Sequence, residues 1–254
     1  MSSSLSILTF HAVDDLASVI AFPPEVFENG MAQLHNRSYR TLNLVELTDY
    51  VRRGVPFPDN SVVITFDDGY RSVYEQAFPV LQSYGMTATV FLTVGKTKKK
   101  RLPSMEGRSM LSWHEIKEMH RAGIAFGAHT LTHPDLTRLP AELLEAEVVG
   151  GKKVIEDALG CRVDTFAYPF GRYDERCREL VSRHFLCACS DRLGLCRSTS
   201  DRYAMERVDA YYLRTERLFH MMLTSVFPFY VHARAVPRRI RRAVSSLYPH
   251  RDSG

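Results

Sequence analysis

The chain has 254 residues, of which 45% are apolar and 24% are charged. This length and balance fit one α/β domain of the larger kind and exclude collagen-like, coiled-coil and wholly disordered chains. No run of about eighteen or more apolar residues is present, so the sequence predicts no transmembrane helix.

The predicted elements alternate between strands and helices along the chain. The predicted strands cover residues 5–10, 61–66, 86–94, 124–128, 163–168 and 185–190. The predicted helices cover residues 24–34, 44–53, 73–84, 112–122, 140–159 and 174–183. Residues 61–66 form a continuous β-branched run, which is typical of a buried parallel strand. The repeated strand-then-helix order indicates parallel strands joined by helical crossovers, in an open sheet or a closed barrel.

Local end signals support the predicted helices. Gly54, Gly85 and Gly160 each follow the last residue of a predicted helix, where a left-handed residue ends the helix. Ser112 and Glu115 have the spacing of a capping box, in which side chains bind the first free amides of a helix. These signals fix the ends of several crossovers.

The charge of the chain is unevenly distributed. Residues 232–254 hold six arginines and one acidic residue and carry a charge of +5, whereas the rest of the chain carries −1. A second basic cluster covers residues 96–101. Such clusters are usually solvated, but they also suit an anionic ligand or membrane surface.

Five cysteines occur in the chain, at positions 161, 177, 187, 189 and 196. The odd number, together with a first segment that lacks the features of a secretory signal, predicts reduced thiols and a cytoplasmic protein. Cys187 and Cys189 can lie on one face of a strand, and we interpret them as core residues because no partner pair at zinc-finger spacing accompanies them.

Polar side chains follow four of the predicted strands. In α/β folds the loops at the carboxyl ends of the strands form the functional site. The residues at these ends are His11, Asp67 with Asp68, His129 with His133, and the segment Tyr168-Pro169-Phe170-Gly171. We therefore expect these groups to come together at one end of the sheet.

The residue types at these strand ends suit a catalytic metal site. Two histidines at positions i and i+4 point the same way on one helical turn, and imidazole is a common zinc ligand. One carboxylate from another strand end completes a three-ligand set that leaves a coordination position for water. Consecutive side chains diverge, so one of Asp67 and Asp68 binds the metal while the other acts as a base.

A simpler interpretation exists for each motif taken alone. An Asp-Asp-Gly segment is usually only a turn, and two histidines four residues apart on a helix usually lie at the surface. Both motifs follow strands of the same α/β chain, and His11 follows a third strand. This combination favours the metal site.

Three segments resemble the motifs of one family. Residues 65–70 (TFDDGY) resemble the first motif of the polysaccharide deacetylases, the NodB-homology group of carbohydrate esterase family four. Residues 129–133 (HTLTH) resemble the second motif, and residues 166–171 (FAYPFG) the third. The resemblance covers residues 5–190. It implies a distorted parallel (β/α) barrel of about seven strands, with a catalytic domain over residues 1–215 and a basic, partly apolar C-terminal extension over residues 216–254.

The resemblance also implies roles for the motif residues. Asp67 corresponds to the general base, and Asp68, His129 and His133 correspond to the ligands of one divalent metal ion. Zinc is the favoured ion, with cobalt, nickel and manganese as alternatives. The metal would polarise the acetyl carbonyl and activate water, and the backbone amide of Tyr168 would help to hold the oxyanion. Pro169 and Phe170 of the same motif would then lie beside the substrate.

The chain departs from the common family pattern at its general acid. Most members carry this histidine in a late Leu-x-His motif, whereas the late histidines here are His220 and His232 in other contexts. The early segment Leu8-Thr9-Phe10-His11 resembles the circularly permuted members, including poly-N-acetylglucosamine deacetylases, whose last motifs come first. This resemblance predicts that His11 is the acid; the alternative is that His11 only packs at the barrel mouth.

A second departure concerns the third motif. Many members have an arginine two residues before its proline, where it orients the base, but Phe166 and Ala167 occupy this region here. Arg172 follows the motif and is not equivalent, so another group must orient Asp67. Trp113 either lines the sugar groove or, as is commoner for a tryptophan in a capping box, packs in the core.

These features together predict a metal-dependent hydrolase that removes the N-acetyl group of an amino-sugar glycan or lipid-linked saccharide and releases acetate. The alternatives are a metal amidohydrolase of small non-sugar amides and an inactive glycan-binding homologue. The apolar stretch at residues 219–231 and the arginines after it predict peripheral contact with an anionic membrane at its inner face. We expect no nucleic-acid partner.

Overall fold

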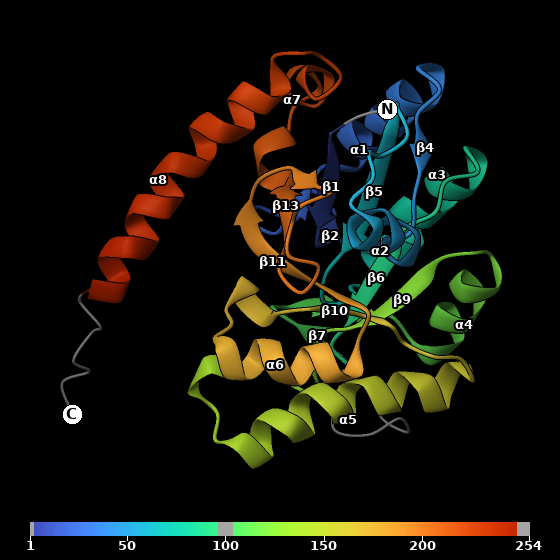
Figure 1. Cartoon of the computed structure of the whole chain (residues 1–254). Coiled ribbons are helices and arrows are strands. Elements are labelled where there is room, and N and C mark those ends of the chain that lie inside the picture. The colour runs from blue at the N-terminus through green and yellow to red at the C-terminus, as the bar shows by residue number, and fades with distance from the viewer. Residues whose placement is uncertain (1–2, 96–103, 248–254) are drawn as a thin grey trace.

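The computed structural model describes residues 3–95 and 104–247, with side chains as far as residue 238. The basic cluster at residues 96–101 lies outside the described residues. Figure 1 shows a central barrel of strands surrounded by helices, with the long helix α8 (Phe227–Leu247) on one side. No helix in the described part of the chain is long and apolar enough to span a bilayer.

Seven strands form a closed barrel in which every neighbouring pair is parallel. They follow one another around the barrel in chain order, and the last strand closes the ring by pairing with the first. The seven strands are β1 (Ser4–Phe10), β5 (Ser61–Phe66), β6 (Thr89–Leu92), β9 (Ala125–Ala128), β10 (Thr165–Ala167), β11 (Cys187–Leu193) and β13 (Met205–Asp209). The predicted parallel barrel is confirmed, and its sheet is closed; β13, however, was not among the predicted strands.

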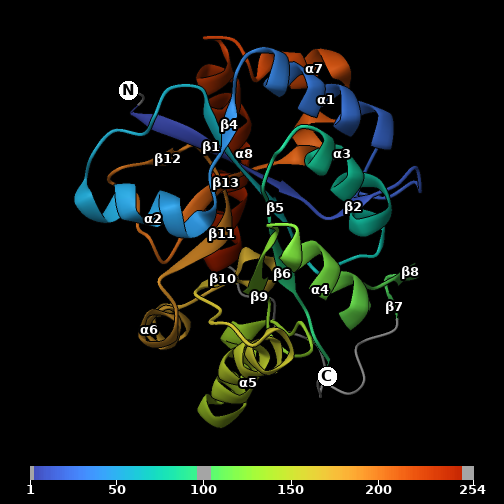
Figure 2. The same ribbon diagram turned by 90° about the vertical axis from the view of Figure 1, so that its right-hand side faces the viewer.

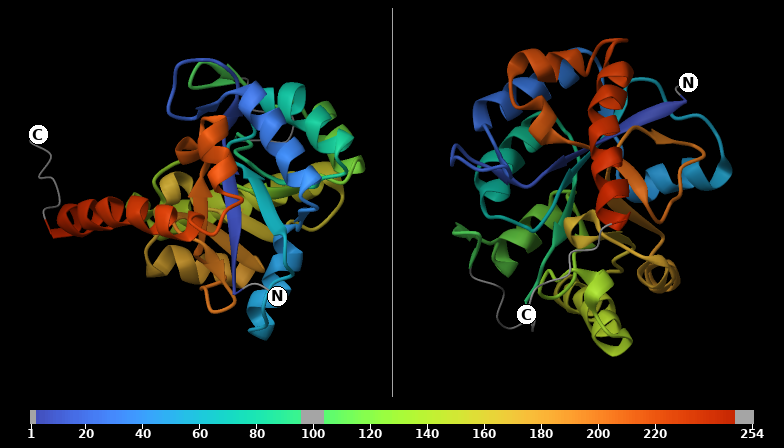
Figure 3. Two further views of the ribbon diagram at one scale, coloured as in Figure 1. Left: turned by 90° about the horizontal axis from the view of Figure 1, so that it is seen from above. Right: turned by 90° about the vertical axis from the view of Figure 1, so that its left-hand side faces the viewer.

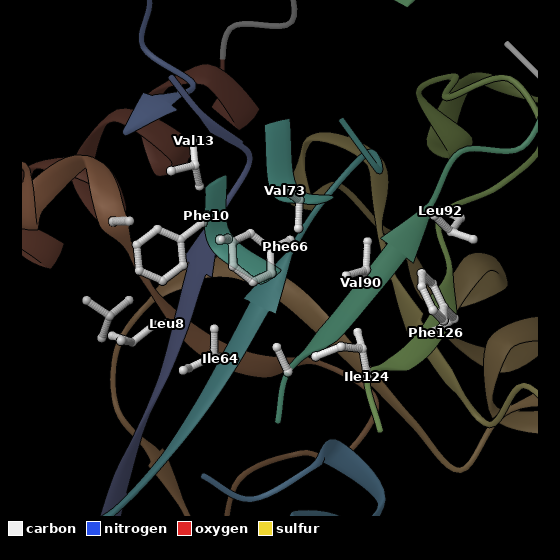
Figure 4. Packing of buried hydrophobic residues seen from close by; sticks show 14 of the residues in the cluster. Leu8, Phe10, Val13, Ile64, Phe66, Val73, Val90, Leu92, Ile124 and Phe126 are labelled. Carbon is white, nitrogen blue, oxygen red and sulfur yellow. The ribbon is translucent and has the colours of Figure 1, made fainter. Parts of the chain in front are cut away.

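The barrel strands are buried on both faces. Leu8 and Phe10 of β1, with Ile64 and Phe66 of β5, pack in the larger core cluster, between the barrel and its helices (Figure 4). The ring of Phe10 meets that of Phe27 edge to face at 5.2 Å, and such a pair contributes about 0.5–1.5 kcal/mol beyond burial. Alternate residues of the same strands belong to a second cluster, so both sides of each strand are covered.

The second core cluster contains the predicted core cysteines. Cys187 and Cys189 of β11 are buried with Ile7 and Val63, and no disulfide joins any of the five cysteines. Because the two thiols lie two residues apart on one strand, both face the same side. The interpretation of Cys187 and Cys189 as core residues is confirmed.

Helices cover the outside of the barrel (Figure 2). They are α1 (Pro24–Asn36), α2 (Leu44–Arg53), α3 (Phe78–Ser83), α4 (Trp113–Arg121), α5 (Ala141–Leu159), α6 (Glu175–His184) and α7 (Glu216–Met221), besides α8. The end signals are confirmed where they were clearest. Gly54 and Gly160 adopt left-handed conformations with φ of 61° and 70°, and Ser112 and Glu115 form a complete capping box.

The helix expected over residues 73–84 is not uniform. It begins with a π-helical turn (Val73–Ala77), and the amide of Phe78 donates to the carbonyl of Val73, five residues earlier. The next residue, Pro79, has no amide hydrogen for the ladder of an α-helix. The wider turn accommodates this missing donor before the regular helix α3 starts.

Shorter elements complete the fold. The short strands are β2 (Ala12–Val13), β3 (Ala21–Phe22), β4 (Arg40–Thr41), β7 (Ser104–Met105), β8 (Arg108–Ser109) and β12 (Cys196–Arg197). β7 and β8 form an antiparallel hairpin. Its Arg108 binds both carboxylate oxygens of Asp14 at 2.8 and 3.2 Å, which connects the hairpin to the loop after β2.

The C-terminal segment packs on the barrel domain before α8 extends past it (Figure 3). Phe219 of α7 is buried against Gly30 of α1, where a Cβ atom would lie 2.6 Å from the ring. In α8, Phe227, Val231 and Ala235 are buried and lie at four-residue intervals, so one face of the helix meets the body. Part of the apolar stretch at residues 219–231 therefore serves packing. The division of the chain at residue 215 stays a prediction.

Candidate active site

The candidate site is a cavity of about 210 Å³ at the carboxyl ends of the barrel strands. Its position agrees with the rule that parallel barrels carry their sites at this end. The side chains that line it from the strand ends and their loops are His11, Asp67, Asp68, His129, His133, Phe170, Asp191, Arg207 and Asp209. The sequence-predicted strand-end groups thus come together in one cavity.

Asp68, His129 and His133 form a compact cluster with the composition of a metal site. Oδ1 of Asp68 lies 3.5 Å from Nε2 of His129 and 3.4 Å from Nε2 of His133, and the three ligand atoms lie within 4.8 Å of one another. Oδ1 of Asp68 is buried and has no hydrogen-bond partner in the described structure. A buried polar atom without a partner is costly, and a bound cation would satisfy it. The donor set fits a divalent metal ion.

The two histidines converge through a loop and not through a helical turn, so that expectation was wrong. Residues 129–133 have no helical structure, and Thr130 and His133 have positive φ angles of 69° and 61°. The carboxylate of Glu147 on α5 accepts hydrogen bonds from the amides of Leu131 and Thr132 at 2.9 and 2.8 Å. These contacts stabilise a loop with left-handed backbone angles, which residues other than glycine rarely adopt.

The environment of His129 prepares it as a neutral ligand. Its Nδ1 lies 2.7 Å from the carbonyl oxygen of Ala167, which selects the tautomer that carries its proton on Nδ1. Nε2 is then the free lone pair on the side of Asp68. Burial lowers the pKa of His129 to about 3, so the ring is neutral at neutral pH.

Asp67 lines the same cavity as the Asp68–His129–His133 cluster and pairs with Arg207. Nη1 and Nη2 of Arg207 donate to Oδ1 and Oδ2 of Asp67 at 2.8 and 2.7 Å, a bidentate pair that is almost fully buried. Burial by itself would raise the pKa of Asp67, but the charge and hydrogen bonds of Arg207 hold it well below its usual range. Asp67 is therefore an oriented carboxylate that stays ionised in a buried site.

Sequence reasoning missed Arg207. It lies on β13, the strand that was not predicted, and its Nε donates to the carbonyl of Ser190 at 2.9 Å. Arg207 therefore orients Asp67, which the residues of the third motif cannot do. Arg172, by contrast, pairs with Asp135 at 2.8 Å, which confirms that it is not equivalent. The only signal in the sequence was an arginine beside a valine in a short stretch, Met205–Asp209, that is otherwise too polar to resemble a core strand.

His11 lies directly opposite Asp67 because of strand register. β1 and β5 pair in parallel up to Phe10 and Phe66, so the residues that follow, His11 and Asp67, leave the barrel side by side. Nε2 of His11 lies 4.0 Å from Oδ2 of Asp67, and the ring lines the cavity while 28% of its side chain is exposed. The late histidines lie elsewhere: His220 contacts Gln33 at 2.9 Å, and His232 is exposed on α8.

The third motif corrects one expectation. The amide of Tyr168 donates to the carbonyl of Cys189 at 3.2 Å, and the side chain of Tyr168 is buried. The amide is committed to the pairing of β10 with β11, so it is not free to bind an oxyanion. Phe170 is the motif residue that lines the cavity, with a φ of 56° and its ring 4.6 Å from that of His133. Pro169 is buried behind it.

Trp113 does not reach the cavity. Its indole packs against the larger core cluster, and it is not among the described residues that line the site. This packing agrees with the core interpretation, and the sugar contact stays a prediction. This agrees with its place as the first residue of α4, on the helix side of the barrel wall.

A closed parallel barrel with this Asp–His–His cluster beside a buried, oriented carboxylate defines a barrel hydrolase with a candidate metal centre. The family model described as polysaccharide deacetylase matches residues 54–186, just over half of the chain. The chain belongs to this family, the NodB-type carbohydrate esterases of family four, and is a hydrolase of carbon–nitrogen bonds other than peptide bonds.

Named relatives agree with this family. YxkH of Bacillus subtilis is 30% identical over 207 residues, which cover 81% of this chain and 71% of that protein. A poly-β-1,6-N-acetyl-D-glucosamine N-deacetylase of Staphylococcus aureus is 30% identical over 154 residues, which cover 57% of this chain. The match spans only 52% of the staphylococcal protein, about half of its length.

Solved structures share the fold along most of the chain. IcaB from Ammonifex degensii has a TM-score of 0.73 at 26% identity and covers 86% of this chain and 97% of its own. The deacetylase PplD of Streptococcus pyogenes has a TM-score of 0.75 at 22% identity and covers 82% of this chain and 93% of its own. The barrel of this chain is thus similar to that of deacetylase structures.

Proposed function

We propose that this protein is a metal-dependent N-deacetylase of an amino-sugar glycan or lipid-linked saccharide. The observation that carries the proposal is the arrangement of one cavity, in which Asp68, His129 and His133 face Asp67 and His11. Amide hydrolysis needs an activated water, a base, an acid for the leaving amine and a site for the oxyanion. The cavity offers a residue for each of these tasks.

Asp68, His129 and His133 are the proposed metal ligands. A divalent ion in this position, with zinc as the favoured metal, supplies the Lewis acidity that polarises the acetyl carbonyl and acidifies water. Asp67 accepts the proton of the attacking water as the new carbon–oxygen bond forms. Arg207 keeps both oxygens of Asp67 in a fixed plane and keeps the carboxylate ionised, so the base is oriented before substrate arrives.

His11 is the proposed general acid. When the carbon–nitrogen bond breaks, the nitrogen must gain a proton, because an amide anion is too poor a leaving group. His11 lies in the same cavity as Asp67 and is exposed enough to meet the substrate nitrogen. The products are acetate and the free amine of the sugar.

Phe170 supplies the proposed amide donor for the oxyanion. In the third motif, the amide of Tyr168 donates to Cys189, Pro169 has no amide hydrogen, and the amide of Gly171 donates to the carbonyl of Tyr168 at 2.8 Å. The remaining amide of residues 168–171 is that of Phe170, which lines the cavity and has a left-handed backbone conformation. A preorganised donor of this kind is typically worth about a hundredfold or more in rate.

Two other functions stay open. A metal amidohydrolase of small non-sugar amides would use the same catalytic groups in a more closed cavity. An inactive glycan-binding homologue is disfavoured because Asp67, Asp68, His129 and His133 are all present and converge. The staphylococcal relative is named for poly-β-1,6-N-acetyl-D-glucosamine, and this makes β-1,6-linked N-acetylglucosamine the first substrate to test.

Acetate release tests the proposal. Purified protein with added zinc is incubated with β-1,6-linked N-acetylglucosamine oligomers, chitooligosaccharides, peptidoglycan fragments, lipid-linked acetamido sugars and simple acetamides. We expect acetate from at least one acetamido sugar and little from sugar-free amides. Turnover of the simple amides alone would favour the amidohydrolase, and binding of a glycan without any acetate would favour the inactive homologue.

We also propose peripheral contact with an anionic membrane through the C-terminal segment. The basic residues 234–251 follow a region where Val226 and Phe229 are 57% and 75% exposed. Exposed apolar residues beside arginines suit the interface of an anionic bilayer. A lipid-linked saccharide at such a surface would be a matching substrate.

A further inference from the structure

Helix α8 contributes a side chain to the active-site cavity. Arg238 lines this cavity together with His11, Asp67 and Asp68, although it comes from the C-terminal segment. Val231 and Ala235 of the same helix are buried against the body. Arg238 follows Val231 by seven residues and Ala235 by three, so it lies on the same face of the helix. The buried apolar residues therefore anchor the helix to the body, and Arg238 also lies over the ring of Tyr212 at 5.8 Å.

The contacts of Arg238 are long. Its guanidinium lies 3.7 Å from Oδ2 of Asp191 and 3.7 Å from Oδ2 of Asp209, beyond the usual length of a hydrogen bond. Arg207, in the same cavity, binds its partner at 2.7 and 2.8 Å. Arg207 is fully engaged with the base, whereas Arg238 is held near two carboxylates without a close bond to either.

The three side chains are also partly open to solvent. Arg238 is 32% exposed, and Asp191 and Asp209 are 30% and 37% exposed. Exposed ion pairs of this kind contribute little to stability, so rearranging them around a ligand costs little. Five N–H donors beside carboxylate acceptors form a surface that can both donate and accept hydrogen bonds.

We propose that Arg238 is a substrate-binding residue, which with Asp191 and Asp209 binds the hydroxyl groups of the sugar unit at the reactive centre. This inference rests on the proposed function. Sugar hydroxyls both donate and accept, so they match an arginine between two carboxylates. An anionic ligand fits less well, because five carboxylates line this cavity: those of Asp67, Asp68, Glu106, Asp191 and Asp209. The C-terminal helix then forms one wall of the active site.

The test compares two arginines of α8 on two substrates. Arg238→Ala removes the cavity residue, and Arg234→Ala is the matched control, since Arg234 lies one turn earlier over the rings of Tyr212 and Tyr230 at 5.9 and 5.3 Å. One substrate is a β-1,6-linked N-acetylglucosamine tetramer, or whichever acetamido sugar the unmodified protein deacetylates fastest. The other is 4-nitrophenyl acetate, which carries an acetyl group and no sugar.

For Arg238→Ala we expect the KM for the sugar to rise about tenfold or more, with kcat nearly unchanged. Turnover of 4-nitrophenyl acetate and metal content should match the unmodified protein, and Arg234→Ala should match it on both substrates. Arg238→Lys should keep most of the KM defect, because an ammonium group cannot replace the planar fork.

Two results would overturn the inference while the proposed function stands. One is an unchanged KM for the sugar in Arg238→Ala. The other is an equal loss on both substrates, which would mean that Arg238 acts through the fold. A protein that releases no acetate from any acetamido sugar would instead overturn the proposed function, and the sugar contact of Arg238 with it.

Discussion

Arg207 and Asp67 are 140 positions apart in the chain, yet their side chains form a buried bidentate pair with distances of 2.8 and 2.7 Å. The pair joins β13 to the end of β5, the two strands that flank β1. A buried carboxylate without a partner would become neutral, and a neutral carboxyl group cannot accept a proton. The ion pair therefore makes Asp67 usable as a base in a buried site.

Replacing Arg207 should change the pH dependence of the reaction. In Arg207→Lys we expect kcat/KM to fall about ten- to a hundredfold, because one ammonium group cannot hold both carboxylate oxygens in place. Arg207 lowers the pKa of Asp67, so a weaker pairing lets burial raise it again. The acidic limb of the kcat/KM profile should therefore move to higher pH. Arg172→Lys, at the surface pair with Asp135, is the control and should leave the profile unchanged.

The same pair should appear in the stability of the protein. Arg207→Met leaves Asp67 buried and unpaired, which costs about 3–5 kcal/mol of unfolding free energy. The double variant Asp67→Asn/Arg207→Met removes both charges and should recover much of that loss without recovering activity. The pKa of Asp67 is lowered in the folded state from its ordinary value of 3.8. The pair therefore stabilises the native protein at pH values above 3.8, and this contribution is lost as the pH falls through the lowered pKa. Equal urea midpoints for all three proteins would contradict the account.

The two adjacent aspartates should behave differently when each is changed to asparagine. Asp67→Asn should keep the metal and lose about a hundredfold or more in kcat, the usual scale for a general base. Asp68→Asn should lower metal affinity itself, because Oδ1 of Asp68 lies between the two histidines. Metal content and acetate release, measured on the same samples, separate the two effects. Equal loss of metal in both variants would show that the roles are wrongly assigned.

His133 should be required for tight metal binding. In His133→Ala we expect zinc affinity to fall by about a hundredfold or more, since one of three protein ligands is lost and two remain. His220→Ala is the control, because His220 contacts Gln33 away from the cavity. Zinc titration with a competing chelator measures both proteins. A His133→Ala protein that still binds one zinc ion as tightly as the unmodified chain would exclude this cluster as the site.

His11 should control the basic side of the pH profile. His11→Ala removes the proposed proton donor, so kcat should fall while metal content stays the same, and the decline at high pH should disappear. The profile of kcat against pH, with zinc content as control, measures this. The role would pass to the C-terminal segment if His11→Ala kept a normal profile while His220→Ala or His232→Ala became inactive.

The proposed membrane contact should depend on salt and on the arginines of the C-terminal segment. Each basic residue near an anionic surface contributes about 1 kcal/mol, so Arg239→Gln/Arg241→Gln should weaken vesicle binding by about thirtyfold. The control, Arg52→Gln/Arg53→Gln, removes the same charge from exposed positions on α2. Flotation with vesicles that contain phosphatidylserine measures the bound fraction. An unmodified protein that fails to float even at low salt would refute the membrane contact.

The parts of the site that sequence predicted are those fixed by local chemistry. Short apolar runs directly precede His11, the pair Asp67 and Asp68, and His129. Residues that follow parallel strands lie together at one edge of the sheet. Gly54 and Ser112 likewise mark helix ends through their own backbone and side-chain preferences. Each of these signals lies within a few residues of its structural effect, so it can be read from the sequence.

The parts that sequence did not predict depend on distant contacts. Arg207 is buried only because Asp67 neutralises it, and Arg238 reaches the cavity only because α8 packs on the barrel. His129 and His133 converge through a left-handed loop that Glu147 stabilises from α5, although their spacing favours a helix. In each case the partner lies on another element, and local periodicity carries no information about it.

The most direct test of the central claim is the rate of acetate release against equivalents of zinc. Protein stripped with a chelator and verified to be metal-free is titrated with zinc, with the most reactive acetamido sugar as substrate. The account predicts no turnover without metal and a linear rise to a plateau at about one equivalent, since Asp68, His129 and His133 form a single centre. Full activity in the metal-free protein would contradict it.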